Sequence, residues 1–277
     1  MPSYVITGAS RGLGWGFVKH LSEDTSNTVI GLVRNAPATI ERVKTELADR
    51  KNIHILQADR NDTPALKKAA ADTANITGGS LDYLVGNAAY LDMFDQFDGP
   101  SGFLANSTPE EFTKLFRSFF DTNVLAQIFL YEAFLPLLLK GSIKKVLSIS
   151  SCMGDPDFNR EWAHDQAILY SSSKAALNMV NIKFGAQYKK DGVLFISMCP
   201  GVVDTGYENN RIYIRPALAA KLQEIVGKFQ AYSPDFKGAH EPVESVKMML
   251  GVLDKLSIEN NDQGKYLSHL GTKRWLP

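Results

Sequence analysis

The sequence predicts an α/β fold in which a parallel sheet of about seven strands is covered by helices on both faces. Three observations lead to this prediction. Short apolar segments alternate with longer helical segments along the 277 residues, and repeated units of this kind build doubly wound parallel sheets. A glycine-rich turn follows the first apolar segment. Neither an internal repeat nor a flexible linker interrupts the pattern, so we expect a single domain spanning residues 1–277.

Seven segments are predicted as strands, because each is short, rich in apolar residues and bounded by turn residues. The first begins almost at the N-terminus and leads into Gly8, and the fifth ends in a pair of serines. Parallel strands end at the same edge of a sheet, so we expect ligands to bind where these segments end. The predicted strands span residues 4–7, 28–33, 52–58, 81–85, 145–150, 193–199 and 264–268.

The segments between the strands carry helix signals. Thr108 is a good N-cap residue and Pro109 suits the first helical position. Glu110 and Glu111 complement the helix dipole in the first turn. This helix is expected to run to about residue 130, with a continuation that ends before residue 140. The other predicted helices span residues 12–21, 40–48, 63–73, 170–188 and 241–256.

Two segments, residues 92–107 and 204–241, break the alternation and are expected to be long irregular loops. Both follow strands, so both should lie at the ligand-binding edge of the sheet. Long loops in such folds generally belong to the functional site. We expect residues 204–241 to form a substrate-binding lid, with a hinge around Gly206, Asn209 and Asn210.

Composition and charge narrow the classes of partner. Hydrophobic residues make up 44% of the chain and charged residues 22%, which allows a large globular core. The 30 basic residues balance 30 acidic ones, so no net charge attracts nucleic acid or an anionic membrane. The five histidines lack metal-ligand spacing, and we expect no metal. Cys152 and Cys199 suit a reducing compartment, and we expect both to be small buried residues near the ligand edge.

The chain shows no sign of a membrane segment. Its N-terminus lacks a basic region followed by an apolar stretch, so we expect no signal peptide. The most apolar stretch, residues 128–139, is interrupted by Glu132 and Pro136 and is too short to span a bilayer. We therefore expect a cytoplasmic protein without membrane or nucleic-acid partners.

The glycine-rich turn, residues 7–14 (TGASRGLG), stands between a predicted strand and a predicted helix. Glycines permit a tight turn and let the backbone approach a diphosphate, while the N-terminus of the next helix offers free N–H groups to that anion. The strand before and the helix after the turn favour a dinucleotide site over an ordinary structural turn.

Two arginines indicate which dinucleotide binds. Arg11 lies in the turn, and Arg34 follows the second strand in the sequence LVRN, where no acid is present. An acidic side chain at this point usually meets a free ribose 2′-hydroxyl, whereas guanidinium groups suit a 2′-phosphate. We therefore prefer NADP(H) as the cofactor. The alternative is that Arg34 is an ordinary surface residue.

Tyr170 and Lys174 are four residues apart, which places them on one face of a helix. A nearby ammonium favours the phenolate, so we expect the tyrosine pKa to be lowered toward the working range. Such a tyrosine can exchange a proton with a carbonyl oxygen. Ser151 follows the fifth strand, and its hydroxyl can polarise that carbonyl. The alternative is that Ser150 and Ser151 only cap the strand.

These residues together resemble the classical short-chain dehydrogenase/reductase family, over almost the whole chain. The resemblance implies a Rossmann-type dinucleotide-binding fold. The expected cofactor contacts are Gly8, Ser10, Arg11, Gly12, Leu13, Gly14, Arg34, Asp59, Arg60, Asn87, Ala88, Tyr170, Lys174, Pro200, Gly201, Val203 and Thr205. Among these, Asp59 matches the acid that meets the adenine ring, and residues 200–205 resemble the motif that binds the nicotinamide carboxamide.

The resemblance also implies catalytic roles for four residues. Tyr170 is expected to supply the proton and Ser151 to orient the carbonyl. Lys174 is expected to lower the tyrosine pKa and to hold the nicotinamide ribose. Asn123 matches the asparagine that positions Lys174 through a water molecule.

The implied function is that of an NADPH-dependent reductase that transfers hydride to a ketone or aldehyde, as a homodimer or homotetramer. The tail, residues 264–275, resembles the sniffer-like carbonyl reductases. One alternative is an NAD(P)-dependent alcohol dehydrogenase working in the oxidative direction. Another is a cofactor-sensing binding protein on the same fold. The two arginines favour reduction, and the complete set of Ser, Tyr, Lys and Asn argues against a sensor.

Two features depart from the family pattern. Ala89 replaces a glycine after Asn87 and Ala88, and residues 155–166 lengthen the interval between the serine and tyrosine motifs. This extra segment either forms a wall of the substrate pocket or obstructs a subunit interface. Aromatic residues near the expected pocket favour a small apolar or aromatic substrate. The alternative is that most of them are ordinary core or loop-anchoring residues. These aromatic residues are Tyr90, Phe94, Phe97, Phe158, Trp162 and Tyr207.

Overall fold

The computed structural model describes residues 1–92, 95, 97–206 and 216–277. Seven parallel strands form one sheet in the order β3-β2-β1-β4-β5-β6-β7, which confirms the predicted fold class. The strand order reverses between β1 and β4, where doubly wound sheets bind their ligands. The strands span Ser3–Thr7 (β1), Thr28–Val33 (β2), Ile53–Gln57 (β3), Tyr83–Gly86 (β4), Lys145–Ile149 (β5), Leu194–Cys199 (β6) and Tyr266–Ser268 (β7).

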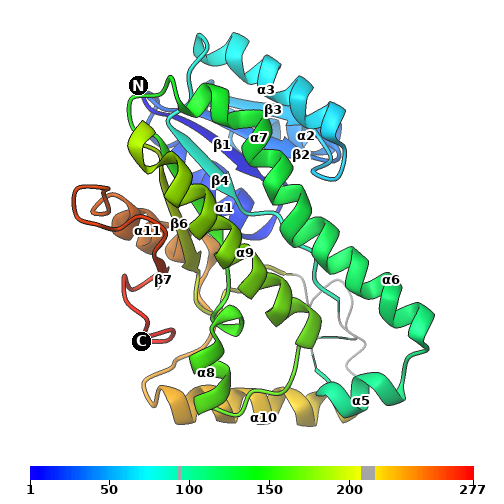
Figure 1. Ribbon diagram of the computed structural model, residues 1–277. Helices are drawn as coiled ribbons and strands as arrows, with labels where there is room; N and C mark the ends of the chain where they lie inside the picture. The colour runs from blue at the N-terminus through cyan, green and yellow to red at the C-terminus, as the bar shows by residue number, and fades with distance from the viewer. Residues whose placement is uncertain (93–94, 96, 207–215) are drawn as a thin grey trace.

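Helices cover both faces of the sheet (Figure 1). One face packs against α1, α2 and α11, and the other against α3, α7 and α9. Within the described residues, no helix is long and apolar enough to cross a membrane. The helices span Gly12–Leu21 (α1), Ala36–Glu46 (α2), Thr63–Thr77 (α3), Pro100–Ala105 (α5), Pro109–Phe120 (α6), Ala126–Leu138 (α7), Pro156–Glu161 (α8), Ile168–Tyr188 (α9), Pro216–Tyr232 (α10) and Pro242–Leu253 (α11).

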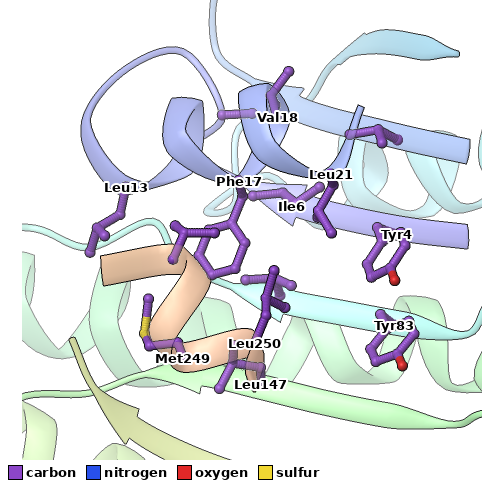
Figure 2. Packing of buried hydrophobic residues seen from close by; sticks show 14 of the residues in the cluster. Tyr4, Ile6, Leu13, Phe17, Val18, Leu21, Tyr83, Leu147, Met249 and Leu250 are labelled. Carbon is purple, nitrogen blue, oxygen red and sulfur yellow. The ribbon is translucent and has the colours of Figure 1, made fainter. Parts of the chain in front are cut away.

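The larger core lies beneath α1 and α11, which cross the same face of the sheet. Phe17 of α1 is fully buried and packs toward Met249 and Leu250 of α11 (Figure 2). Tyr4 and Tyr83 stack with their ring centroids 4.5 Å apart on neighbouring strands. Full burial of such side chains contributes roughly 1.5 to 3 kcal/mol each, so this core holds α1, and with it the glycine-rich turn, in a fixed place.

Two helix boundaries differ from the prediction because of local caps. Helix α2 begins at Ala36 rather than near residue 40, since the Asn35 side chain accepts a hydrogen bond from the Ala38 backbone N–H. Helix α3 continues to Thr77 and ends at Gly78, whose φ of +71° provides a left-handed cap.

The long helix predicted from residue 109 is interrupted. A capping box between Thr108 and Glu111 starts α6 as expected, but a π-helical turn, Asp121–Leu125, separates α6 from α7. Such turns insert extra backbone into a helix and frequently mark functional positions. Asn123 lies in the middle of this turn and is buried.

The prediction of two long irregular loops is wrong in part. Residues 92–107 contain α5, and residues 204–241 contain the 17-residue helix α10. Together with α8, these helices lie beyond the carboxyl ends of the strands, in the lower part of Figure 1. Proline stands at the first position of all three helices, where its missing N–H costs nothing. Phe94, Tyr207, Asn209 and Asn210 lie outside the described residues.

Candidate active site

The glycine-rich turn joins β1 to α1 and is held against β2. The Gly8 N–H donates to the Leu32 carbonyl at 2.9 Å. Gly8 and Gly12 have φ values of +68° and +54°, a region that favours glycine. A Cβ atom on Gly14 would lie 2.1 Å from the Gly8 carbonyl oxygen. The turn is therefore so compact that two of its glycines need their backbone freedom and a third has no room for a side chain.

The first turn of α1 fits an anionic group. No side chain caps it, and it contains no acidic residue, so its N–H groups and positive dipole end suit a diphosphate. The flanking side chains of Ser10, Arg11 and Arg34 are exposed, whereas Leu13 is buried. Asp59 is also exposed, at the end of β3 beside β2. The predicted cofactor residues thus stand at one edge of the sheet.

Asn87 and Ala88 lock the end of β4 onto this turn. The Asn87 side chain donates to the Thr7 carbonyl at 2.9 Å, and the backbone N–H groups of Asn87 and Ala88 donate to the Thr7 hydroxyl at 3.0 and 3.1 Å. A Cβ atom on Gly8 would lie 2.9 Å from the Ala88 Cβ. Ala89, the departure from the family pattern, is exposed.

Arg60 lies below the site surface. Its side chain is buried and donates to the carbonyls of Ala88 and Thr122, the latter at 2.7 Å. Burial lowers the pKa of Arg60 to about 10. The residue therefore ties the loop after β4 to the π-helical turn.

Residues 200–205, after β6, approach the glycine-rich turn from the other side. A Cβ atom on Gly12 would lie 3.1 Å from the Thr205 Cβ, so the two motifs are in contact. Gly201 has a φ of +79°, and a side chain there would meet the ring of His269. The Pro200 carbonyl accepts from the Ser245 hydroxyl at 2.7 Å, and Val203 forms a bridge with His240.

Sequence reasoning missed Arg42, which reaches the glycine-rich turn from α2. Its guanidinium donates to the Ser10 carbonyl at 2.8 Å, pairs with Glu46 at 2.7 Å and lies 4.2 Å from the Trp15 ring centroid. A charge-pattern search along one helix detects the pairing with Glu46, but it does not reveal the contact with a turn 32 residues away.

Tyr170 and Lys174 face the same region, as their spacing predicts. The Lys174 Nζ lies 5.6 Å from the Tyr170 ring centroid and donates to the Ile149 carbonyl at 2.7 Å. Ser151, directly after β5, is close enough to Tyr170 to lower the pKa of that tyrosine. The three residues therefore meet at the carboxyl end of β5.

The expected pKa shift of Tyr170 is wrong in direction. Burial raises the pKa of Tyr170 well above its usual value, and the nearby Ser151 side chain opposes this only in part. Burial also lowers the pKa of Lys174 to about 7, assisted by repulsion from the Arg60 charge. A fully buried site disfavours both charged forms, and this desolvation outweighs the attraction that the sequence spacing suggests.

The ambiguity between the two serines after β5 is resolved by their contacts. The Ser150 hydroxyl is buried and donates to the Asn178 side chain at 2.7 Å. The Ser151 hydroxyl accepts a weak bond from the Met153 N–H at 3.3 Å and lies beside Tyr170. Ser150 thus holds α9 on the sheet, whereas Ser151 faces the site.

Asn123 organises the site through neighbours other than Lys174. Its side chain accepts from the Tyr90 N–H at 2.7 Å and donates to the Tyr90 carbonyl at 3.1 Å. It also donates to the Ser173 hydroxyl at 3.0 Å, and Ser173 in turn donates to the Tyr170 carbonyl at 2.8 Å. Asn123 therefore connects the loop after β4 to the first turn of α9, which carries Tyr170.

Asp95 is a second residue that sequence reasoning missed. Its carboxylate accepts from the backbone N–H groups of Leu169 and Tyr170, each at 2.9 Å, and its carbonyl accepts from Ala167 at 3.0 Å. Ala167 has a left-handed φ of 58° and its side chain provides no cap, so Asp95 supplies the missing N-terminal acceptor of α9. No local signal predicts this cap, since the partners lie 74 and 75 residues apart.

A cavity of about 140 Å³ lies beside Tyr170. Phe229 and Ile225 of α10 close it on one side, and His164 and Gln166 of the extra segment contribute to it. Residues 155–166 therefore provide part of the pocket wall. The described residues that line it are Leu91, Asp92, Asp95, Met153, His164, Gln166, Ala167, Tyr170, Ile225 and Phe229.

The aromatic residues predicted near the pocket divide into several environments. Phe158 is buried in a cluster that also contains Trp162, and Phe97 is buried as well. Tyr90 packs edge-on against Phe119, with ring centroids 5.0 Å apart. All four flank the pocket without lining it.

The two cysteines lie together near the site, as expected. The Cys152 N–H donates to the Cys199 sulfur at 3.2 Å, and both thiols are free. Burial and the partner thiol raise the pKa of Cys152. The two cysteines pack with Phe158 and Trp275 in an apolar cluster. Such surroundings suit a structural role for both thiols.

A family model described as short chain dehydrogenase matches residues 3–212. The chain belongs to the short-chain dehydrogenase family. It is therefore an oxidoreductase that uses a nicotinamide cofactor and acts on a small molecule. The glycine-rich turn, with its uncapped helix and exposed arginines, fits such a cofactor.

Relatives of this short-chain dehydrogenase match along its full length. The short chain dehydrogenase virK of Hypocrea virens is 51% identical over 276 residues, which covers 100% of both chains. The short-chain dehydrogenase/reductase iacC of Pestalotiopsis fici is 44% identical over 277 residues, again covering 100% of both.

Solved structures support the same assignment. An NADPH-bound carbonyl reductase from chicken fatty liver has a TM-score of 0.74 and 26% identity, covering 98% of each chain. The carbonyl reductase Sniffer of D. melanogaster also has a TM-score of 0.74, with 98% of each chain covered. At 22% identity, the second likeness shows the fold alone.

Lys174→Met is expected to stabilise this short-chain dehydrogenase at low pH. Burial depresses the pKa of Lys174 to about 7, so the folded state binds fewer protons than the unfolded state between about pH 7 and pH 10. The penalty of the buried charge is complete below pH 7 and is lost as pH rises through that window. At 1.36 kcal/mol per pKa unit, the free energy of unfolding of the variant should exceed that of wild type by on the order of 3 kcal/mol at pH 6.5. This net gain includes the loss of the hydrogen bond to the Ile149 carbonyl.

Urea unfolding at pH 6.5 and pH 9 tests this expectation. The difference in free energy of unfolding between the variant and wild type should be smaller by about 2 kcal/mol at the higher pH. Lys183→Met, at an exposed position of the same helix, is the matched control and should show no such dependence. A Lys174 variant whose advantage is the same at both pH values would contradict the burial argument.

Proposed function

We propose that this short-chain dehydrogenase is an NADPH-dependent carbonyl reductase that reduces a ketone or aldehyde on a small apolar or aromatic substrate. One observation carries the proposal: Tyr170 lines a largely apolar pocket, and the Lys174 Nζ lies 5.6 Å from its ring centroid. Reduction needs an acid at the carbonyl oxygen, and a raised tyrosine pKa keeps this acid protonated at neutral pH.

Each step at the carbonyl has a residue to perform it. When bound, NADPH supplies the hydride that reaches the carbonyl carbon. Tyr170 donates its proton to the carbonyl oxygen, and Ser151 holds that oxygen by a hydrogen bond as negative charge develops there. Lys174, partly protonated at neutral pH, offers a buried cation close to the tyrosine ring, and it would hold the nicotinamide ribose of the bound cofactor.

Three further residues keep the tyrosine in place. Asp95 caps its helix through the Tyr170 N–H itself, and Asn123 reaches the same turn through Ser173. Catalysis depends strongly on such positioning, because small displacements of a reacting group cost large factors in rate. We assign Asn123 and Asp95 to positioning rather than to proton transfer.

The proposed cofactor contacts lie at the edge of the sheet where the parallel strands end. We propose that the diphosphate lies against the turn from Gly8 to Gly14, and that Asp59 meets the adenine. Asn87, Ala88 and Arg60 act by bracing this turn and the adjoining loop. The carboxamide is assigned to the motif Pro200, Gly201, Val203 and Thr205, whose last residue contacts Gly12.

We also propose that residues 204–241 form a lid over the substrate. Helix α10 lies within residues 204–241 and closes the pocket through Ile225 and Phe229.

The proposed homodimer or homotetramer has support from the surface of α9. Apolar residues of this helix, including Met179 and Ile182, are exposed and could pack against another subunit.

A turnover assay tests the proposed activity. The purified protein is given NADPH and a panel of aromatic ketones, aldehydes and quinones, and NADPH consumption is followed. We expect steady turnover with at least one class of carbonyl. Oxidation of the matching alcohols with NADP⁺, without reduction at neutral pH, would favour the dehydrogenase direction. Tight binding of NADPH without turnover of any of these compounds would favour a sensor.

Arg34→Asp is expected to reverse the cofactor preference. Arg34 is exposed at the carboxyl end of β2, where a guanidinium binds a 2′-phosphate and a carboxylate binds a 2′-hydroxyl. A charge-assisted contact contributes roughly 1.5 to 3 kcal/mol, so NADPH affinity should fall by at least about tenfold, while NADH affinity rises. Fluorescence titration measures both. Lys44→Asp, at an exposed position of α2, is the control. Equal affinities for the two cofactors before and after the change would disprove the role of Arg34.

A further inference from the structure

The pocket beside Tyr170 contains a polar atom without a hydrogen-bond partner among the described residues. The Nε2 atom of His164 is buried and has no hydrogen-bond partner among the described residues. An unpaired buried polar group costs about 1 to 3 kcal/mol, so such groups in a pocket indicate where a ligand atom belongs.

The ring of His164 is held rigidly in this position. It stacks on Phe158 with ring centroids 5.0 Å apart and an interplanar angle of 21°, and its backbone N–H donates to the Asn159 carbonyl at 3.1 Å. Phe229 of α10 lies on another side, at 6.2 Å between centroids. An orphan nitrogen on a fixed ring is a preformed partner for a substrate group.

The chemistry of His164 selects the kind of group. Burial and the nearby Lys228 cation lower its pKa, so the imidazole is neutral at neutral pH. A neutral imidazole has one N–H and one acceptor nitrogen. A hydroxyl group both donates and accepts, so it can pair with Nε2 in either role.

The two carboxylates of the pocket have partners. Asp95 uses both carboxylate oxygens on the N-terminus of α9, and Asp92 accepts from the Tyr90 hydroxyl at 3.0 Å. Both carboxylates disfavour an anionic substrate by repulsion. Most of the remaining lining is apolar, including Leu91 and Met153, which suits a hydrophobic body with one hydroxyl.

We infer that His164 is a specificity-determining residue, whose Nε2 forms a hydrogen bond with a hydroxyl group that the substrate carries apart from its reacting carbonyl. This inference rests on the proposed reductase function and narrows its substrate class to hydroxylated carbonyl compounds. A substrate without the hydroxyl leaves Nε2 unpaired, and sites of this kind reject such analogues strongly.

Paired substrates test this with the complete enzyme and NADPH. The pairs are acetophenone with its hydroxy derivatives, and 2-acetylnaphthalene with its hydroxy derivatives. For wild type, kcat/KM should be at least tenfold higher for one hydroxylated member than for its parent. His164→Phe keeps the stacked ring and removes the nitrogen, so it should abolish that preference, mainly through a raised KM. His164→Gln returns a hydrogen-bonding group and should restore part of the preference.

Two controls separate recognition from damage. His20→Phe removes an imidazole on α1 that pairs with Glu23, far from the pocket, and should leave both substrates unaffected. His164→Phe should lower kcat/KM for the hydroxylated member of a pair much more than for its parent ketone. An equal loss on hydroxylated and parent substrates, or no preference in wild type, would overturn the inference.

Calorimetry that measures binding of the same compounds distinguishes failure of the inference about His164 from failure of the proposed reductase function. If no carbonyl is reduced, the reductase proposal fails, and binding alone then decides the role of His164. A preference for the hydroxylated ligand that disappears in His164→Phe supports recognition by Nε2. Equal affinities in both proteins contradict it.

Discussion

Tyr170→Phe is expected to lower the rate of carbonyl reduction by at least about 100-fold, which is the usual scale of general acid catalysis. The change removes the hydroxyl that we propose protonates the carbonyl oxygen and leaves the ring in its buried position. NADPH affinity should stay close to wild type, because the glycine-rich turn belongs to β1 and α1 and not to this hydroxyl. Single-turnover kinetics with saturating NADPH measure the chemical step, and fluorescence titration measures cofactor affinity.

The matched control is Tyr188→Phe, at the last residue of the same helix. Tyr188 packs with Phe184 and Phe195 against the far part of the sheet, so the loss of its hydroxyl should leave turnover unchanged. A Tyr170 variant that retains more than about a tenth of the wild-type rate points to a different acid, since general acids contribute 10²-fold or more.

Gly14→Ala should cause the largest loss of cofactor binding. The added Cβ would lie 2.1 Å from the Gly8 carbonyl oxygen and 2.7 Å from its carbon, and backbone atoms on both sides cannot move aside as a flexible side chain does. Overpacking of this kind costs about 1 to 3 kcal/mol or more. Because the displaced backbone is the proposed diphosphate cradle, we expect NADPH affinity to fall by about 100-fold and the melting temperature to fall by several degrees.

Gly251→Ala is the control for this substitution. Gly251 lies inside α11, and a Cβ there meets no described heavy atom within 4 Å. In a helix interior this change should stabilise the protein by about 0.5 to 1 kcal/mol and leave cofactor affinity unaltered. NADPH binding by Gly14→Ala at wild-type strength would show that the turn relaxes without cost, against the close packing described here.

The sequence by itself determined those features whose cause is local. Strand and helix positions follow from the alternation of apolar and helical segments, and the compact turn follows from glycines at Gly8, Gly12 and Gly14. The proximity of Tyr170 and Lys174 follows from a four-residue spacing on one helix. Each of these depends on residues that are neighbours along the chain, so a pattern in the sequence is sufficient to predict it.

The tertiary structure alone decided features that depend on distant partners or on burial. Asp95 caps a helix 74 residues away, and the choice between Ser150 and Ser151 depends on Asn178. Helix α10 closes the pocket although its segment reads as a loop. The pKa of Tyr170 rises because burial removes solvent from the phenolate, which outweighs the nearby Lys174. Solvent exclusion is a property of the folded chain as a whole, and no spacing between two residues encodes it.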